Sequence, residues 1–503
     1  MTEVTGWASL GEVSDEPVEQ AGPMTTADFV YVDIGSIDRD RKAIATAQTV
    51  PVGNAPSRAK QRLRTGDVLV SMTRPNLNAV AIVPASLEGA IGSTGFHVLR
   101  SKYMVPQYLY FLVQSQQFVD AMCAVVQGAL YPAVRPSDIN AFGMRIPSRI
   151  EQTRIVDKLE ELLSDLDAGV AELKAAQKKL AQYRQSLLKA AVEGRLTEAW
   201  RAQHGNTSAN EESGSQLLTR ILGERRACWE AKQLAKFEAQ GKAPVKGWQD
   251  KYPEPMRPKA SGLPALPASW TWTTVDELSP DDLANGRSVP TAAAGAKVLR
   301  LNALKSGAVD LTKFKLGAWS EGEAKQFAVA DGDLLIARGN GSLKLVGRAG
   351  LVAGVSEQVA YPDTMIRLRL VELVVRPAWI GLLWDSARTR SHIEQQARTS
   401  AGIYKISQPD IVSVVVPVPP LAEQDHLLAE IAREVEQIVR TEQSIETALH
   451  QSAAQRKNIL QAAFSGQLVP QDPDDEPASV LLARIRAERA SQPAKLRKPR
   501  ALG

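Results

Sequence analysis

The chain has 503 residues, more than a single hydrophobic core usually serves, so we expect roughly two to four domains. Hydrophobic residues make up 44% and charged residues 23%, which excludes a wholly disordered or collagen-like chain. The net charge of +4 is too small to indicate a nucleic-acid partner by itself, and the two cysteines match no disulfide or metal-ligand pattern. Residues 1–17 lack a basic region followed by an apolar run, so no secretory signal is predicted and we expect a cytoplasmic protein.

The first 150 residues predict a lobe that mixes short strands with one helix. Runs rich in β-branched residues and bounded by Gly, Asn or Pro are typical of strands, and they occur at 29–34, 67–72 and 80–83. One amphipathic helix is expected over residues 106–124. Residues 41–149 carry 12 Lys and Arg against 4 Asp and Glu, so this lobe is basic.

A much longer helix follows the first lobe. Over residues 155–187, apolar side chains recur every three or four positions, which indicates a helical seam and not a strand. Pro147 and Gly194 stand where such a helix begins and ends. A helix of about 40 residues is about 60 Å long, which is too long to be buried in a small domain. We therefore expect it to pack against a second helix.

A polar and partly helical connection, residues 197–261, leads to a second lobe at 262–422. This lobe again predicts short strands, at 298–301, 333–337 and 365–370, and one amphipathic helix over 377–398. Residues 283–409 carry 17 Lys and Arg against 10 Asp and Glu, so the second lobe is basic as well.

The second half of the chain repeats the first. A shift of 272 positions aligns residues 138–196 with 410–468 without a gap, and 13 of the 59 aligned residues are identical. Ordered matches also occur outside the helix: Gly66-Asp67-Val68-Leu69 with Gly332-Asp333-Leu334-Leu335, 7–13 with 272–278, and 217–221 with 481–485. The sequence therefore predicts a duplicated unit of lobe, long helix and helical tail. The second long helix is expected to be the antiparallel partner of the first, although each helix could instead pack on another protein.

Sequence motifs of catalysis are absent. The chain has no Gly-x-x-x-x-Gly-Lys loop, no Cys-x-x-Cys, no His-x-x-x-His and no nucleophile elbow. We therefore predict no catalytic residue, no cofactor site and no metal site. Acidic residues that are brought together only by folding leave no linear pattern, so a cryptic acidic site stays open as an alternative.

Two loops in each lobe carry the residue types that read nucleic acids, since Arg pairs with guanine and Asn or Gln with adenine, while basic side chains attract phosphates. One loop follows the Gly-Asp strand and the other precedes an Asp-Ile pair. Their positions recur in both lobes while their residues differ, as the reading of two different sequences requires. The candidate DNA-binding residues are Arg74, Asn76, Asn78, Tyr131 and Arg135 in the first lobe and Arg338, Asn340, Ser342, Lys344, Tyr404 and Lys405 in the second.

The duplicated pattern resembles the DNA-specificity subunits of type I restriction-modification systems. The resemblance rests on Ile146-Pro147 to Glu151-Gln152, on Val418-Pro419 to Glu423-Gln424, and on the Gly-x-Leu ends of both long helices. It implies an α+β fold with two target-recognition lobes, an antiparallel pair of long helices and a pseudo-twofold duplication. The expected segments are a first target-recognition domain (1–150), a first long helix (151–196), a connection (197–261), a second target-recognition domain (262–422), a second long helix (423–468) and a tail (469–503).

The resemblance also implies what the chain does and with which partners. Each lobe would read one half of a bipartite double-stranded DNA site, and two methyltransferase subunits, with restriction (translocase and nuclease) subunits, would assemble on a chain that is not itself an enzyme. S-adenosylmethionine, ATP and magnesium would then belong to the partners. Two alternatives stay open: a self-contained DNA-processing enzyme with a cryptic acidic site, and a coiled-coil scaffold with no role on DNA.

Overall fold

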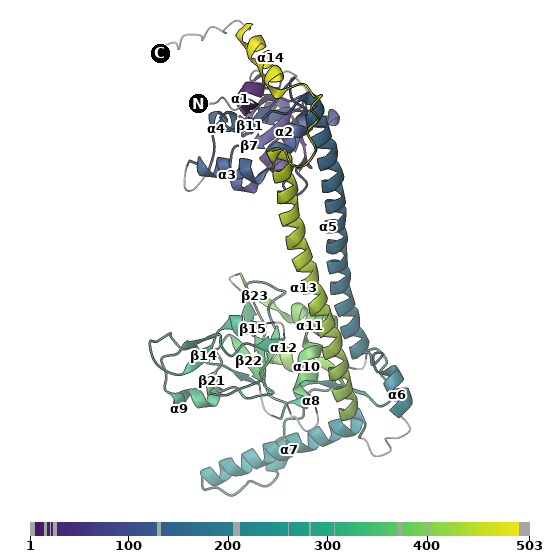
Figure 1. Cartoon of the computed structure of the whole chain (residues 1–503). Coiled ribbons are helices and arrows are strands. Elements are labelled where there is room, and N and C mark those ends of the chain that lie inside the picture. Colours follow the sequence, from purple (N-terminus) through teal and green to yellow (C-terminus); the bar gives the residue numbers. More distant parts are fainter. Residues whose placement is uncertain are drawn as a thin grey trace, which may run out of the picture. The chain divides into compact units, whose positions relative to one another are not determined.

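In a computed structural model the chain forms two compact units, unit 1 (residues 1–175 and 444–503) and unit 2 (residues 176–443). The structure describes residues 6–14, 18–20, 22–23, 28–127, 132–204, 212–259, 261–280, 283–305, 307–370, 375–400 and 402–491. Short strands and helices are mixed in both units, which confirms the mixed α and β class (Figure 1). Among the described residues, no helix is both long and apolar enough to cross a membrane.

Unit 1 is built around a buried central strand, β7 (Val68–Ser71). Its two larger sheets have the strand orders β10 (Phe96–Leu99), β7, β8 (Val80–Ile82) and β5 (Gln48–Val50), β2 (Phe29–Val32), β9 (Ile91–Ser93), β6 (Ala59–Arg62). Val68 and Val70 pack into the core beneath the helices, whereas Leu69 packs into a second core together with Val32. Because both faces of β7 are covered, its sequence is apolar along most of its length and does not alternate.

Unit 2 is arranged around a similar strand, β18 (Leu334–Ala337). Its largest sheet has the order β13 (Ala284–Asn285), β22 (Met365–Leu368), β18, β20 (Ala349–Leu351), β16 (Ala308–Val309), β15 (Leu304–Lys305). Leu334 and Ile336 pack with the buried Trp379 and Trp384, and Leu335 packs into the core on the opposite face. A smaller sheet has the order β17 (Phe314–Leu316), β14 (Lys297–Leu299), β21 (Val359–Ala360).

We predicted one amphipathic helix in each lobe. This prediction is wrong, because each of the two segments forms two helices. Residues 106–124 form α2 (Pro106–Leu112) and α3 (Gln116–Ala124), and the later segment forms α10 (Pro377–Trp384) and α11 (Ala387–Gln396). A serine causes each break: the Ser115 hydroxyl accepts from the Phe118 N–H and the Ser386 hydroxyl from the Thr389 N–H, both at 3.3 Å. A serine that caps these N–H groups starts a new helix, so the first helix ends before it.

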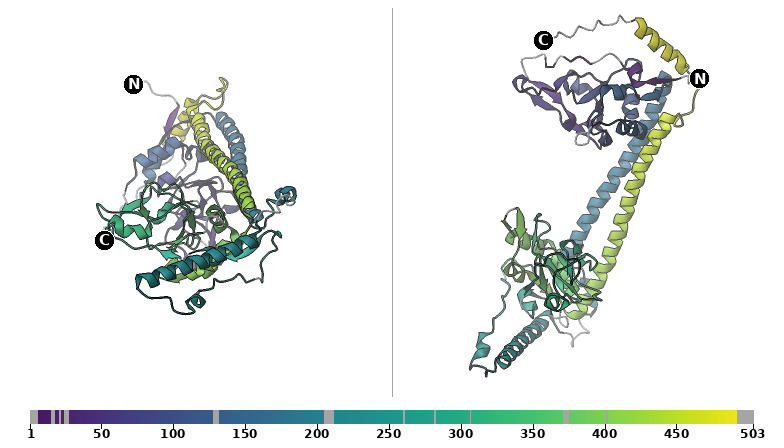
Figure 2. Two further views of the ribbon diagram at one scale, coloured as in Figure 1. Left: turned by 90° about the horizontal axis from the view of Figure 1, so that it is seen from below. Right: turned by 90° about the vertical axis from the view of Figure 1, so that its left-hand side faces the viewer.

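Each long helix contributes to both units. They are α5 (Arg149–Val192) and α13 (Leu421–Ser465), and within each unit their segments run side by side (Figures 1 and 2). Within unit 1, Leu159 of α5 shares a core with Leu460 of α13, and Asp167 forms an ion pair with Arg456. Within unit 2, the Tyr183 hydroxyl donates to Glu434 at 2.9 Å. The contacting residue numbers rise along α5 and fall along α13, so the helices are antiparallel in each unit.

A buried glutamine ties the start of each long helix to the lobe beside it. The Gln152 side chain accepts from the Val105 N–H at 2.8 Å and donates to the Pro147 carbonyl at 3.1 Å. Gln424 makes the corresponding bonds, from the Arg376 N–H at 2.8 Å and to the Pro419 carbonyl at 2.9 Å. Val105 and Arg376 are the N-cap residues of α2 and α10, so each glutamine joins the beginnings of two helices.

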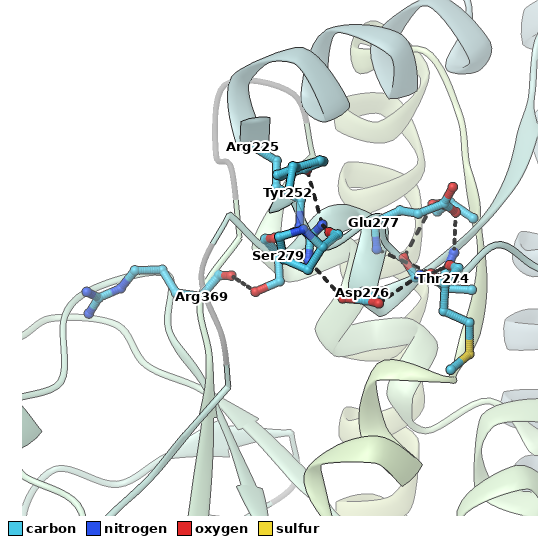
Figure 3. Close-up of polar contacts among 10 residues, drawn as sticks. Arg225, Tyr252, Thr274, Asp276, Glu277, Ser279 and Arg369 are labelled. Atoms are coloured by element: carbon cyan, nitrogen blue, oxygen red, sulfur yellow. Dashed lines mark hydrogen bonds and ion pairs between the residues drawn. The ribbon is translucent and has the colours of Figure 1, made fainter. Parts of the chain in front are cut away.

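Each unit also contains a strand that leads directly into one helical turn. These elements are β1 (Trp7–Ser9) with α1 (Leu10–Val13), and β12 (Thr271–Thr274) with α8 (Val275–Leu278); both turns begin with a capping box. In unit 2 the α7 helix (Gly214–Ala239) holds this turn, since the Arg225 guanidinium donates to Asp276 at 3.1 Å and to the Ser279 carbonyl at 3.0 Å (Figure 3). In unit 1, α14 (Ala478–Ser491) contacts α1.

Candidate nucleic-acid interface

In unit 1 the loop after β7 lies against the segment that precedes the short helix α4 (Pro136–Asn140). Thr73 forms a β-bridge with Ala133, and the Arg74 N–H donates to the Pro132 carbonyl at 2.8 Å. About 60 residues of chain separate the two segments, so folding brings them together. Of the first-lobe candidates, Tyr131 lies outside the described residues.

The loop after β7 presents two of its candidates to solvent and turns the third inward. It contains the 3₁₀ turn η3 (Pro75–Leu77), and Arg74 and Asn76 on this turn are exposed. Asn78 is half-buried, and its side-chain amide donates to the Val113 carbonyl at the end of α2 at 3.1 Å. Arg74 and Asn76 can therefore contact a ligand, whereas the Asn78 side chain anchors the loop.

Arg135 is exposed in the second segment of unit 1. Its guanidinium donates to the Gln127 side chain at 2.8 Å, and its N–H donates to Asp138 at 2.7 Å. Asp138 is the first residue of the Asp-Ile pair, so its carboxylate fixes the backbone that presents Arg135. This segment and the loop after β7 together place Arg74 and Arg135 on neighbouring stretches of chain.

In unit 2 the two candidate loops form one small sheet. Its order is β19 (Gly339–Asn340), β24 (Ile403–Lys405), β23 (Arg398–Ser400). Gly339 pairs with Lys405, Asn340 pairs with Tyr404, and the Ile406 N–H donates to the Arg338 carbonyl at 3.0 Å. The backbone pairing therefore holds the loop after β18 beside the segment that precedes α12 (Gln408–Val412).

The unit 2 candidates differ in exposure. Arg338, Lys344 and Lys405 are exposed, while Asn340, Ser342 and Tyr404 are half-buried. The Asn340 side chain accepts from the Ser342 N–H at 3.0 Å, so it also holds the turn. The three exposed cations are available to a ligand. Tyr404 lies on β24, the middle strand of the small sheet.

Sequence reasoning missed Arg398, which belongs to the same surface. Arg398 and Lys405 are directly opposite each other on β23 and β24, and both are exposed. Like charges at directly opposite positions of neighbouring strands repel each other and destabilise the pair. Gly402, in the loop that precedes the Asp-Ile pair, was the available hairpin signal. A bound anion would relieve this repulsion.

No cluster of three or more His, Cys, Asp or Glu residues suited to a metal ion occurs in the part of the chain that the structure describes. The interface candidates among the described residues are cationic and amide side chains together with Ser342 and Tyr404. Such groups donate hydrogen bonds to phosphates and to base edges.

Comparison with known proteins shows what the chain is similar to. No protein-family model matches it. The type I restriction enzyme EcoKI specificity subunit of Escherichia coli K12 is 27% identical over 447 residues, which cover 86% of this chain and 82% of that protein. The type I restriction enzyme StySPI specificity subunit of Salmonella potsdam is 24% identical over 445 residues with the same coverage, 86% and 82%. Over most of its length the chain is therefore similar to specificity subunits of type I restriction enzymes.

Two solved structures resemble the fold of this chain. A chain from a structure describing complex assembly and conformational transition of the type I R-M system aligns with a TM-score of 0.66 and 23% identity, covering 92% of this chain and 98% of that chain. The crystal structure of the HsdS subunit from Thermoanaerobacter tengcongensis aligns with a TM-score of 0.50 and 23% identity, covering 92% and 97%. At this identity the likeness concerns the fold alone.

Proposed function

We propose that this chain is a specificity subunit that reads a bipartite double-stranded DNA site, with one half-site bound by the first lobe and the other by the second. The observation that carries the proposal is the pair of adjoining loops in each unit, which differ in sequence between the units. In unit 2 the pair includes Arg398 and Lys405, two exposed cations directly opposite each other. A polyanion such as DNA satisfies both charges.

The proposal includes an internal duplication with a pseudo-twofold relation between two target-recognition domains, residues 1–150 and 262–422. Recurring contacts support it. Gln152 and Gln424 make matching hydrogen bonds, and Asp67 and Asp333 each bind an arginine, Arg100 at 2.6 Å and Arg369 at 2.7 Å. In each case the aspartate directly precedes the buried central strand that leads into a candidate loop.

The long helices, residues 151–196 and 423–468, would then fix the distance between the two half-sites. The specificity subunit is not itself an enzyme. We assign methyl transfer to adenine to two methyltransferase subunits, and translocation and cleavage to restriction subunits. S-adenosylmethionine, ATP and magnesium would be bound by those partners, and the connection (197–261) and tail (469–503) are available for their assembly.

The test uses the full-length chain assembled with its methyltransferase subunits. Methylated adenines are mapped across a genome that carries the complex. We expect methylation at one bipartite motif with a fixed spacer. Methylation without a two-part motif would reject the proposal, and so would robust DNA cleavage by the purified chain alone, which is the expectation for a self-contained enzyme. A coiled-coil scaffold with no role on DNA predicts no salt-dependent DNA binding by the complex.

Replacing either exposed loop arginine should impair one half-site only. Arg74→Ala or Arg338→Ala is expected to weaken recognition by about 1 to 3 kcal/mol if the guanidinium reads guanine. Arg74→Lys and Arg338→Lys keep the charge but lose the two parallel hydrogen bonds, so they should also lose discrimination while retaining more affinity. The Arg74 variants and the Arg338 variants are controls for each other. Each should relax the specificity of methylation at one half of the motif and leave it unchanged at the other half. Unchanged methylation at every position would remove that arginine from the reading surface.

A further inference from the structure

Three non-glycine residues among those described have a left-handed backbone: Lys42 (φ 54°), Arg74 (φ 50°) and Asn78 (φ 44°). Residues with a side chain rarely adopt this conformation, and such strained residues concentrate at binding sites. Arg74 and Asn78 flank the turn η3, and we call residues 74–78, which include the candidates Arg74, Asn76 and Asn78, loop 74–78. Lys42 lies more than 30 residues earlier in the chain, where no candidate was expected.

Lys42 contacts loop 74–78 directly. Its ammonium group donates to the Asn78 carbonyl at 2.6 Å. The α2 helix holds both partners, because the Tyr110 hydroxyl donates to the Lys42 carbonyl at 3.0 Å and the Asn78 amide donates to the Val113 carbonyl at 3.1 Å. Two strained positions are thus joined to each other and to one helix, and the Lys42 ammonium group is one of the contacts that hold loop 74–78.

The surroundings of Lys42 show that its position is constrained. The side chain is half-buried, and this burial lowers the pKa of its ammonium group. The positive charges of Arg456 and Arg39 lower this pKa further, whereas the negative charge of Asp40 raises it. A long cationic side chain held in this way beside other cations contrasts with the usual extended lysine in solvent. The Nζ hydrogen bond to loop 74–78 gives the burial a structural role.

Lys42 ends a hairpin connection that we call hairpin loop 39–42. The flanking strands β3 (Ile37–Asp38) and β4 (Ala43–Ile44) pair antiparallel, and the Asp38 carboxylate accepts from the N–H groups of Asp40 at 2.9 Å and Arg41 at 3.0 Å. The Asp38 bonds fix the turn, and both arginine side chains, Arg39 and Arg41, are exposed. Neither guanidinium forms an ion pair with another described residue.

We propose that hairpin loop 39–42 is a third DNA-contacting segment of the first lobe, in which Arg39 and Arg41 bind phosphates of the half-site that loop 74–78 reads and Lys42 positions that loop. This inference rests on the proposed function. Exposed guanidinium groups on a backbone-fixed turn suit phosphates, which orient a protein on the duplex without reading its sequence. In unit 2 the strands β15 and β16 also pair antiparallel, and the exposed basic residue beside their turn is Lys305, the last residue of β15.

The experiment measures DNA binding by the full-length chain assembled with its methyltransferase subunits, on a duplex that carries the mapped site, over a series of salt concentrations. Arg39→Ala combined with Arg41→Ala should lower the slope of log affinity against log salt by about 2, since each lost phosphate contact lowers it by about 0.9. Sequence discrimination should stay unchanged at both half-sites. Arg433→Ala, which removes an exposed arginine from α13 in unit 2, is the matched control and should leave the slope unchanged.

Lys42→Met tests positioning separately from charge. It should relax discrimination about fivefold or more at the half-site of the first lobe, with no change at the other half-site. Lys42→Arg should restore part of this discrimination, because a guanidinium can also donate to the Asn78 carbonyl. A general loss of stability would affect both half-sites equally and would overturn the positioning role. Hydrogen exchange in wild-type residues 36–46 provides a second measurement, and we expect protection when DNA is added.

The outcomes separate this inference from the proposed function. If the wild-type complex does not bind its site, the proposed function fails. If the wild-type complex binds but the double arginine variant keeps the wild-type salt slope, or residues 36–46 gain no protection, then hairpin loop 39–42 does not contact DNA. An equal loss of slope in Arg433→Ala would show a general effect of net charge and would also overturn the inference.

Discussion

Lengthening α5 and α13 together by seven residues is expected to increase the preferred distance between the two half-sites. Seven helical residues add about 10.5 Å and almost two full turns, so the apolar face of each helix keeps its direction. Duplicating residues 169–175 and 437–443 places both insertions at the boundary between the units, so the contacts inside each unit are preserved. The rise alone corresponds to about three base pairs at about 3.4 Å each.

The twist of DNA limits this shift. Each added base pair also rotates the second half-site by about 34°, since B-DNA has about 10.5 base pairs per turn. We therefore expect the optimum to move by about one to three base pairs and methylation at the original spacing to fall to background. The measurement is adenine methylation on a plasmid library whose spacer length varies while both half-sites stay fixed.

A matched control inserts the same seven residues into the connection at 205–211, outside both long helices. This insertion should leave the preferred spacing unchanged. An insertion into α5 alone should abolish methylation at all spacings, because it shifts pairs such as Asp167 with Arg456 in unit 1 out of register with those in unit 2. A spacing preference that is indifferent to the double insertion would reject the role of the helices in setting the distance.

Local sequence patterns were sufficient to predict the long helices and the buried strands. The three- and four-residue spacing over 155–187 reports a helix because the same face recurs every 3.6 residues, and α5 includes that whole range. The apolar run at 68–70 reports a strand covered on both faces. The helix breaks at Ser115 and Ser386 were missed because an N-cap inside an amphipathic pattern changes the helix axis without interrupting the pattern.

The site depends on contacts between distant residues, which a linear pattern does not contain. Residue chemistry selected the loops, but only the fold pairs Thr73 with Ala133 and Gly339 with Lys405. Composition could not separate Asn76, which is exposed, from Asn78, whose amide is bonded to α2. Lys42 was missed for the same reason, because nothing in its sequence neighbourhood shows that its ammonium group reaches the Asn78 carbonyl.

Glu423→Ala is expected to cause the largest loss of stability among single substitutions in the part of unit 2 where the end of α5, β12 and the start of α13 meet. The Glu423 carboxylate is 1% exposed and accepts from Arg201 at 2.5 Å, from the Thr197 hydroxyl at 2.6 Å and from the Trp270 indole N–H at 2.8 Å. Arg201 and Thr197 follow the end of α5, Trp270 precedes β12, and Glu423 lies in the first turn of α13. One carboxylate thus joins three segments within unit 2.

Removing this carboxylate leaves buried donors without an acceptor. Breaking a buried ion pair by deleting one partner costs about 3 to 5 kcal/mol, and we expect about 3 kcal/mol here because the Arg201 side chain is 21% exposed. Glu436→Ala is the matched control: it lies on the same helix in the same unit and pairs with an arginine, Arg440, at 2.5 Å, but its side chain is 64% exposed. Exposed pairs of this kind contribute about 0.3 to 0.5 kcal/mol.

Tryptophan fluorescence during urea unfolding of the full-length chain measures both variants. Eight of the nine tryptophans lie in unit 2 and only Trp7 lies in unit 1, so the signal reports the unit that contains Glu423. Glu423→Ala should lower the transition midpoint clearly, Glu436→Ala should change it little, and Glu423→Gln should fall between them, because an amide oxygen still accepts a hydrogen bond but has no charge for Arg201. Equal midpoints for Glu423→Ala and Glu436→Ala would mean that burial does not strengthen this ion pair. The end of α5 would then be held in unit 2 by apolar packing of residues such as Leu187 and Ala191.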